Sequence, residues 1–381
     1  MHINRTLLLV ATALTGIAIV GVLLWYWLLL SAQAPAVDYS AQKLEMLNQA
    51  SDYLLAGNYR TAMEEAIKLT GDDDPFVSIR AQLILNEANF MIGTRESRLA
   101  AIQGSKSLFI RLEGFPEDQA LIATNLLNYL SMAPDSYVFN EIFSSGPFSS
   151  FVVADDYLST VKNLAEYSMS LKPTTTAIAR IGWWHADKIL EISRVHGLSV
   201  EERKMEADEI LKIISDHKNL LTQEIANHED LNPMLKPNFY FWQASLYQAV
   251  ARVYPDYIDE ALQSLQALHN EYETTSSEAG EGLAAVAVLI PYAELYYAQA
   301  LYEVEGEISL PQVKEHLVAL IEAVEANPDI HRASFISMIQ RQAAQAPQYQ
   351  MFRHPTYARF IEEVPEFRIF LESYGWSRAA E

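Results

Sequence analysis

The sequence contains no cysteine. This absence excludes disulfide bonds, thiolate metal sites, cysteine nucleophiles and lipid anchors attached to cysteine. Basic residues are also scarce, because 27 lysines and arginines stand against 49 aspartates and glutamates and leave a net charge of −22. Such a surface repels nucleic acid and anionic lipid headgroups and attracts cationic segments of a partner. We therefore expect no nucleic-acid partner.

Recognisable catalytic and cofactor motifs are missing as well. The chain has no HExxH motif, no glycine-rich phosphate loop and no nucleophile elbow. Its nine histidines are scattered, and the run Asp72–Asp74 lacks the alternating ligands of a calcium loop. We therefore expect no catalytic residue, no cofactor and no metal site. One alternative stays open, an all-helical enzyme acting on glycans, which would need two inward carboxylates beside Trp183 and Trp184.

The one long apolar run is Leu7–Leu30, which carries no charge. As a helix it would be roughly 36 Å long, slightly more than the ~30 Å hydrocarbon core of a bilayer. It ends in Trp25–Trp27, and such aromatic side chains favour the membrane–water interface. These features predict a single uncleaved transmembrane anchor. The alternative is a removed signal peptide, since Ala32–Ala34 resembles a cleavage site, although Pro35 follows it directly.

Charge also predicts the orientation of this anchor. Arg5 precedes the span, and the next basic residue is Lys43. The positive-inside rule therefore places the N-terminus in the cytoplasm and the main domain outside it. We interpret residues 1–30 as a cytoplasmic stub and anchor in the inner membrane of a bacterium. Residues 31–39 are a linker, and a periplasmic domain follows.

The rest of the chain predicts an all-α body, because apolar residues recur with helical spacing and no period-two strand is convincing. We expect helices over 40–55, 59–69, 76–92, 95–112, 116–132, 155–171, 174–196, 199–226, 238–254, 256–272, 278–304, 310–326, 329–346, 356–363 and 366–374. Asp74 has the composition of an N-cap, with Pro75 at the first helical position. The body divides into helical hairpins over 40–133, an irregular segment over 134–153, and further hairpins over 154–381.

The segment 134–153 is rich in aromatic residues among serines, glycine and proline. Its aromatic residues are Tyr137, Phe139, Phe143, Phe148 and Phe151. Long irregular segments in compact domains are often functional, and the aromatic content argues against simple disorder. Two interpretations follow. The segment either folds back onto the body, or it contacts a partner or the membrane surface.

Hairpins are predicted most clearly between residues 239 and 272. Two helices with apolar faces flank a connection at Tyr254–Asp256. The face of the first helix consists of Phe239, Trp242, Leu246, Val250 and Val253, and that of the second consists of Ile258, Leu262, Leu265, Leu268 and Tyr272. Alanines twelve residues apart, in the pairs Ala50/Ala62, Ala88/Ala100 and Ala249/Ala261, would let paired backbones approach closely. Hairpins that follow one another suggest a helical repeat array.

The first hairpin resembles the tetratricopeptide repeat. The resemblance rests on Tyr53, Gly57–Tyr59, Ala62 and Pro75, and Asn327–Pro328 resembles the closing segment of a repeat. It covers about half of the body, and the repeats are irregular. The resemblance implies a right-handed superhelix whose concave face binds peptides or other proteins.

These features predict a membrane-tethered scaffold or adaptor that binds other membrane or envelope proteins, or peptide segments of them. The alternative is a permanent structural subunit of one membrane complex. The predicted partner-binding residues are Tyr137, Phe139, Phe143, Phe148, Phe151, Trp183, Trp184, Tyr296 and Tyr297. Aromatic side chains of this kind supply much of the binding energy of protein interfaces, and core packing is the alternative role for them.

Overall fold

The computed structural model describes residues 41–132, 136–154, 156–190, 198–227, 235–278, 287–344 and 351–377. Across these ranges the regular structure is helical, and the one extended feature is an isolated bridge between Val153 and Asp156. The expected all-α class is therefore confirmed. The predicted anchor Leu7–Leu30 and the linker 31–39 lie outside the described residues. Among the residues that are described, no helix is long and apolar enough to cross a membrane.

The helices agree closely with the predicted ranges. In chain order they are α3 (Ala41–Leu55), α4 (Tyr59–Ile67), α5 (Pro75–Ile92), α6 (Arg95–Arg111), α7 (Pro116–Met132), α8 (Ser136–Phe143), α9 (Tyr157–Leu171), α10 (Thr175–Leu190), α11 (Val200–Asn227), α12 (Leu235–Ala251), α13 (Ile258–Glu278), α15 (Leu289–Glu305), α16 (Leu310–Ala326), α17 (Pro328–His331), α18 (Ser337–Ala344), α19 (Pro355–Glu363) and α20 (Pro365–Ser373). Short 3₁₀ turns and one π-helical turn, Arg332–Ile336, join some of them.

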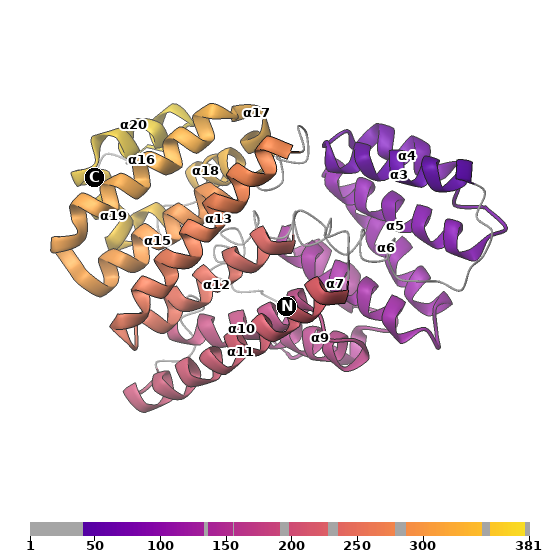
Figure 1. Ribbon diagram of the computed structural model, residues 1–381, viewed down its shortest axis with the longest axis horizontal. Coiled ribbons are helices and arrows are strands. Elements are labelled where there is room, and N and C mark those ends of the chain that lie inside the picture. Colours follow the sequence, from indigo (N-terminus) through magenta and orange to yellow (C-terminus); the bar gives the residue numbers. More distant parts are fainter. Residues whose placement is uncertain are drawn as a thin grey trace.

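The helices pack as pairs in chain order. α3 packs on α4, α5 on α6, α7 on α9, α10 on α11, α12 on α13, α15 on α16, and α19 on α20. The second helix of a pair also packs on the first helix of the next pair, as α4 does on α5, α9 on α10 and α11 on α12. Figure 1 shows the pairs following one another along a curve, from α3 and α4 at one end to α19 and α20 at the other.

The first helices of successive pairs form a layer of their own, which we call the first-helix layer: α5, α7, α10, α12 and α15. α10 packs on both α7 and α12, and α12 packs on α15. α5 joins α7 through the rings of Phe90 and Tyr129, which stack at 3.9 Å between centroids. These helices are enclosed almost all round, since every residue of 237–251 in α12 except Tyr240 is buried. A helix that is buried on all sides belongs to the interior of the protein, even when it carries polar residues.

Local signals account for several helix ends. Asp74 accepts a hydrogen bond from the Phe76 amide, and Pro75 occupies the first position of α5, as predicted. Ser199 and Glu202 bond each other's backbone amides before α11, which is the reciprocal capping box.

Two expectations were wrong, and a third lies partly outside the described residues. Ser136–Phe143 in the segment predicted to be irregular is a helix, α8, whose Phe139 and Phe143 are buried against the body. Of the predicted helix 278–304, Glu278 belongs to α13, residues 279–286 lie outside the described residues, and α15 covers Leu289–Glu305. The predicted helix 329–346 is interrupted by the π-helical turn between α17 and α18.

The alanine pairs were predicted correctly in two places. Ala50, Ala62, Ala249 and Ala261 are all fully buried. Ala100 is exposed, and its neighbour Ala101 is the buried residue, so that pair was assigned one residue too early. The close approach of α5 and α6 lies instead at Gly104, where a Cβ atom would stand 2.3 Å from the Asn86 side-chain oxygen.

Candidate functional site

Buried polar groups without hydrogen-bond partners gather in the first-helix layer. They include Glu87 on α5, Asn125 and Asn128 on α7, Arg180 and Trp183 on α10, Asn238 and Gln248 on α12, and Tyr292 on α15. Asn128 and Asn238 lack a partner on both side-chain atoms. We call Glu87, Asn125, Asn128, Arg180, Asn238 and Gln248 the polar row. Native interiors leave few such groups, so the polar row is the candidate site.

Glu87 is the buried acid of the polar row. Only 3% of its surface is exposed, and neither carboxylate oxygen has a hydrogen-bond partner. Burial raises the pKa of Glu87 to about 8. Burial raises the pKa of Tyr59 on α4 to about 12 and that of Tyr129 on α7 well above its ordinary value, and the Glu87 carboxyl adds to both shifts. Glu87 is therefore mostly a neutral acid at pH 7.

Arg180 is the buried cation of the polar row. It is 5% exposed, and its Nε and Nη2 atoms have no hydrogen-bond partner. Its guanidinium lies 4.9 Å from the ring centroid of Trp242, which supplies a cation–π contact. Burial lowers the pKa of Arg180 to about 10, and the nearby Tyr157 opposes that shift. A charged group of this kind without an ion-pair partner is costly to bury.

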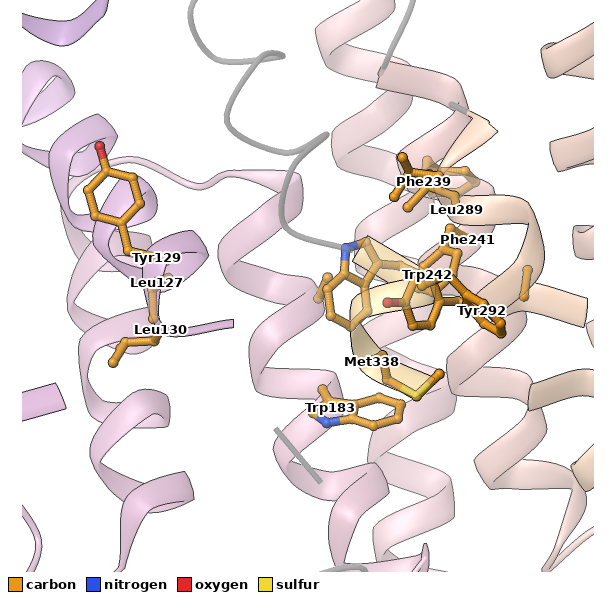
Figure 2. Packing of buried hydrophobic residues seen from close by; sticks show 14 of the residues in the cluster. Leu127, Tyr129, Leu130, Trp183, Phe239, Phe241, Trp242, Leu289, Tyr292 and Met338 are labelled. Carbon is orange, nitrogen blue, oxygen red and sulfur yellow. The ribbon is translucent and has the colours of Figure 1, made fainter. Parts of the chain in front are cut away.

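The predicted residue Trp183 lies beside this arginine. Its ring stands 6.2 Å from that of Trp242 at an interplanar angle of 64°, and 8% of its surface is exposed. Figure 2 shows Trp183, Trp242, Tyr292 and Met338 gathered in one part of the core. Tyr129 lies apart from them on α7. Trp183 thus belongs to the core packing around Arg180.

The other predicted tryptophan, Trp184, lies in a separate polar cluster. Lys188 Nζ stands 3.6 Å from the centroid of its ring and Lys162 Nζ 4.9 Å from it. Lys188 also donates to Glu206 Oε1 at 2.6 Å, and His185 Nδ1 donates to Oε2 of the same carboxylate at 2.5 Å. This cluster holds α9, α10 and α11 together at a half-buried surface.

The aromatic residues of the segment 134–153 pack on the body. Phe139, Phe143 and Phe148 are buried, and Tyr137 and Phe151 are half-buried against the same core. Phe148 lies 4.7 Å from Phe109 of α6, between ring centroids. This geometry agrees with the first interpretation of the segment. Binding of a partner by these residues stays a prediction.

The two predicted tyrosines of α15 also pack internally. Tyr297 is buried, and its ring lies 4.6 Å from that of His316 on α16. Tyr296 is half-buried and lies 6.2 Å from Tyr292. The nine predicted residues therefore fall in separate parts of the array and do not form one site.

A buried carboxylate joins three helices in the C-terminal half. Glu294 of α15 accepts a hydrogen bond from His269 Nε2 of α13 at 2.5 Å and another from His316 Nδ1 of α16 at 2.7 Å. Burial alone would raise the pKa of Glu294, and the two histidine contacts together outweigh it, so the pKa is lowered. Within the described ranges no group of three or more acidic or histidine side chains is arranged to hold a metal ion.

Comparison of the chain with protein-family models, curated proteins and solved structures found no match in any of the three. The geometry of its own residues therefore carries the functional argument.

Sequence reasoning missed the polar row. Glu87 lies in the run 83–92, whose other residues are mostly apolar, and the expectation for an acidic residue is a solvated helix face. The sequence does contain a signal for Glu87. Charged and apolar residues share one helix face at spacings of three and four, namely Phe76, Arg80, Leu83, Glu87 and Phe90.

Proposed function

We propose that the protein is a membrane-tethered scaffold whose helical body binds segments of other membrane or envelope proteins. Leu7–Leu30 would be its anchor, with the body on the outer side of a bacterial cytoplasmic membrane. The pairing of helices in chain order supports the proposal, because such arrays present long continuous surfaces to a partner. The same arrangement fits the tetratricopeptide-like pattern of the first hairpin.

The polar row is the observation that carries the proposal. An asparagine or glutamine side chain has a donor and an acceptor, the same pair that a peptide bond presents. Each buried polar group without a partner costs about 1–3 kcal/mol. Asn128 and Asn238 both leave donor and acceptor unsatisfied in the free chain. Because Asn128 and Asn238 are buried in the free chain, a bound segment would have to open the first-helix layer to reach them. Its backbone would then satisfy both amides, and the cost of leaving them unpaired would be recovered on binding.

The overall charge indicates which segments are favoured. With a net charge of −22, the protein attracts cationic segments at long range and repels acidic ones. Attraction of this kind is screened by salt, because the Debye length falls to about 3 Å at 1 M ionic strength. Binding to a partner should therefore weaken as salt is raised.

The test is partner capture by the full-length protein from its native membrane in mild detergent. We expect the wild type to retain basic partner segments at low salt and to lose most of them at about 0.5 M salt. The double variant Asn125→Leu, Asn128→Leu should retain few partners. It should fold as well as the wild type, since apolar groups replace unsatisfied amides.

The matched control is Gln266→Leu, which removes an exposed amide from α13. It should capture partners as the wild type does. Equal capture by the double variant would show that the polar row takes no part in binding. A single partner held at fixed stoichiometry through high salt would instead identify the protein as a permanent subunit.

A further inference from the structure

Residues 328–344 do not form a helix pair like those of the rest of the array. They comprise α17, the π-helical turn Arg332–Ile336 and α18, and they follow α16 in the chain. α17 and α18 both pack on the turn between them, and α17 also packs on the end of α16. Among the described helices, no other one packs closely on them. We call residues 328–344 the cover segment.

The cover segment places its side chains on aromatic residues of the first-helix layer. The ring of Phe335 meets that of Tyr292 on α15 edge to face, at 4.9 Å between centroids. Figure 2 shows Met338 beside Trp183 of α10 and Trp242 of α12. Both Phe335 and Met338 are fully buried. The cover segment therefore occupies a surface to which α10, α12 and α15 all contribute.

This contact buries polar atoms that have no hydrogen-bond partner. On the cover segment they are both ring nitrogens of His331 and Nε2 of Gln342. On the layer beneath they are Nε1 of Trp183 and the hydroxyl of Tyr292. A buried polar atom without a partner lowers stability, because it has lost its bonds to water. A segment that supplied these bonds would therefore bind the same surface more favourably than the cover segment does.

The cover segment is cationic, unlike the chain as a whole. Residues 330–344 contain Arg332 and Arg341 and no acidic residue, whereas the whole chain has a net charge of −22. Both arginines are exposed, while the apolar side chains between them are buried. A basic helix with one apolar face is the kind of segment that an acidic protein with an apolar surface attracts.

We propose that the cover segment occupies the partner-binding surface on α10, α12 and α15, and that a partner binds there as a basic amphipathic helix that displaces it. This inference rests on the proposed scaffold function. Displacement uncovers Trp183, Trp242 and Tyr292. It also gives a bound segment a route to the polar row, because the guanidinium of Arg180 lies 4.9 Å from the centroid of Trp242.

The experiment weakens the cover segment in the full-length protein and offers the same segment as a free peptide. The double variant Phe335→Ala, Met338→Ala loses two buried side chains of the segment and leaves the surface beneath unchanged. A fluorescein-labelled peptide with the sequence of residues 328–344 is titrated onto the protein in detergent and followed by fluorescence anisotropy. We expect it to bind the double variant at least about tenfold more tightly than the wild type, whose surface is already occupied.

The controls separate docking from a general loss of stability. Phe367→Ala removes a fully buried side chain of α20 and should bind the peptide as weakly as the wild type does. A peptide with both alanine substitutions should bind the double variant at least about tenfold more weakly than the natural peptide. Hydrogen exchange should show α12 and α15 still protected in the double variant. Met338→Ala alone is the milder variant, and it should also bind the natural peptide more tightly than the wild type.

Two outcomes would overturn the inference. One is that the double variant and Met338→Ala bind the peptide no better than the wild type, and the other is equal binding of the natural and alanine peptides. Partner capture separates these failures from failure of the scaffold. If the peptide fails to bind and the wild type still captures partners, the scaffold stands and its partners bind elsewhere. If the peptide binds as expected and neither protein captures a partner, the surface exists and the scaffold function is wrong.

Discussion

Burial keeps Glu87 protonated at neutral pH, and this has a measurable effect on stability. Its pKa is raised to about 8 in the folded protein, from an ordinary value near 4.5. As pH rises between these values, the unfolded chain releases its proton and the folded chain retains it, so the free energy of unfolding falls. The loss is on the order of 5 kcal/mol and is complete above the pKa of Glu87 in the folded protein.

Glu87→Gln removes this dependence, and hydrogen exchange of the α5 amides is the measurement. Near pH 4.5 the variant and the wild type should be similarly protected. Near pH 8 the variant should be the more protected, by a few kcal/mol. Equal protection at both pH values would mean that Glu87 finds a hydrogen-bond partner in solution.

Glu294 shows the opposite pH dependence. Its buried carboxylate is held ionised by His269 and His316, so its pKa is lowered in the folded protein. The stability it contributes is fully present above the pKa of a glutamate in the unfolded chain, near 4.5, and is lost as pH falls through the lower pKa of the folded protein.

Glu294→Gln should therefore destabilise the C-terminal half at neutral pH by about 3 kcal/mol, because two half-buried histidines lose the buried carboxylate with which they pair. The difference from the wild type should shrink as pH falls below the unfolded value. Urea unfolding followed by hydrogen exchange in α13, α15 and α16 measures it. A difference that stays constant down to the lowest pH would show that the carboxylate is not ionised in the fold.

The residue scale is where sequence reasoning succeeded least. His269, Glu294 and His316 are spread over 48 positions of the chain, and no local pattern predicts that they meet. The environment of Glu87 depends on Tyr59 and Tyr129, which belong to two other helices. Such sites form only when helices are packed, so their members carry no signal at short range.

At the scale of a single element, the crossing of α5 and α6 depends on a missing side chain. A Cβ atom on Gly104 would lie 2.3 Å from Asn86 Oδ1. Asn86 has little freedom to move, because its amide donates to Ser105 Oγ at 3.3 Å and its oxygen accepts from Gln82 at 2.9 Å. The helices can approach this closely only where a glycine stands.

Gly104→Ala sets two effects against each other. Alanine favours a helix over glycine by about 1 kcal/mol, whereas overpacking a buried contact costs about 1–3 kcal/mol. Since Asn86 is held on both sides, we expect the clash to win and the protein to lose about 1 kcal/mol, measured as a lower melting temperature. Gly71→Ala is the control, because a Cβ there meets nothing within 4 Å. A stabilised Gly104→Ala would show that Asn86 moves freely.

Helix positions could be predicted because their causes are local. The Asp74–Pro75 start of α5 and the Ser199–Glu202 start of α11 depend on residues within a few positions of each other. Where the cause is tertiary, prediction failed. Phe139 and Phe143 are kept in α8 by burial against the body, and serines, Gly146 and Pro147 nearby masked the helical pattern.

At the scale of the whole molecule, the order of packing follows the order of the chain. Each pair of helices contacts mainly its neighbours, as Figure 1 shows along the curve. Stability in such an array is approximately a sum of local terms and of the interfaces between neighbouring units. A defect in one unit should therefore weaken that unit and its neighbours and leave distant units intact, unlike a defect in a single shared core.

Leu317→Ala tests this property. Leu317 is fully buried in α16, and its truncation should cost about 2–5 kcal/mol through lost contacts and the cavity that remains. Hydrogen exchange should become faster in α15, α16 and α20, which pack together, and stay unchanged in α3 to α6.

Leu126→Ala, which truncates a fully buried leucine in α7, should give the reverse pattern, with the faster exchange near α6 and α9. If both variants raise exchange uniformly along the chain, the array unfolds as one cooperative body. A bound segment could then act on the distant pairs, whereas in a locally stable array its effect stays with the helices it contacts.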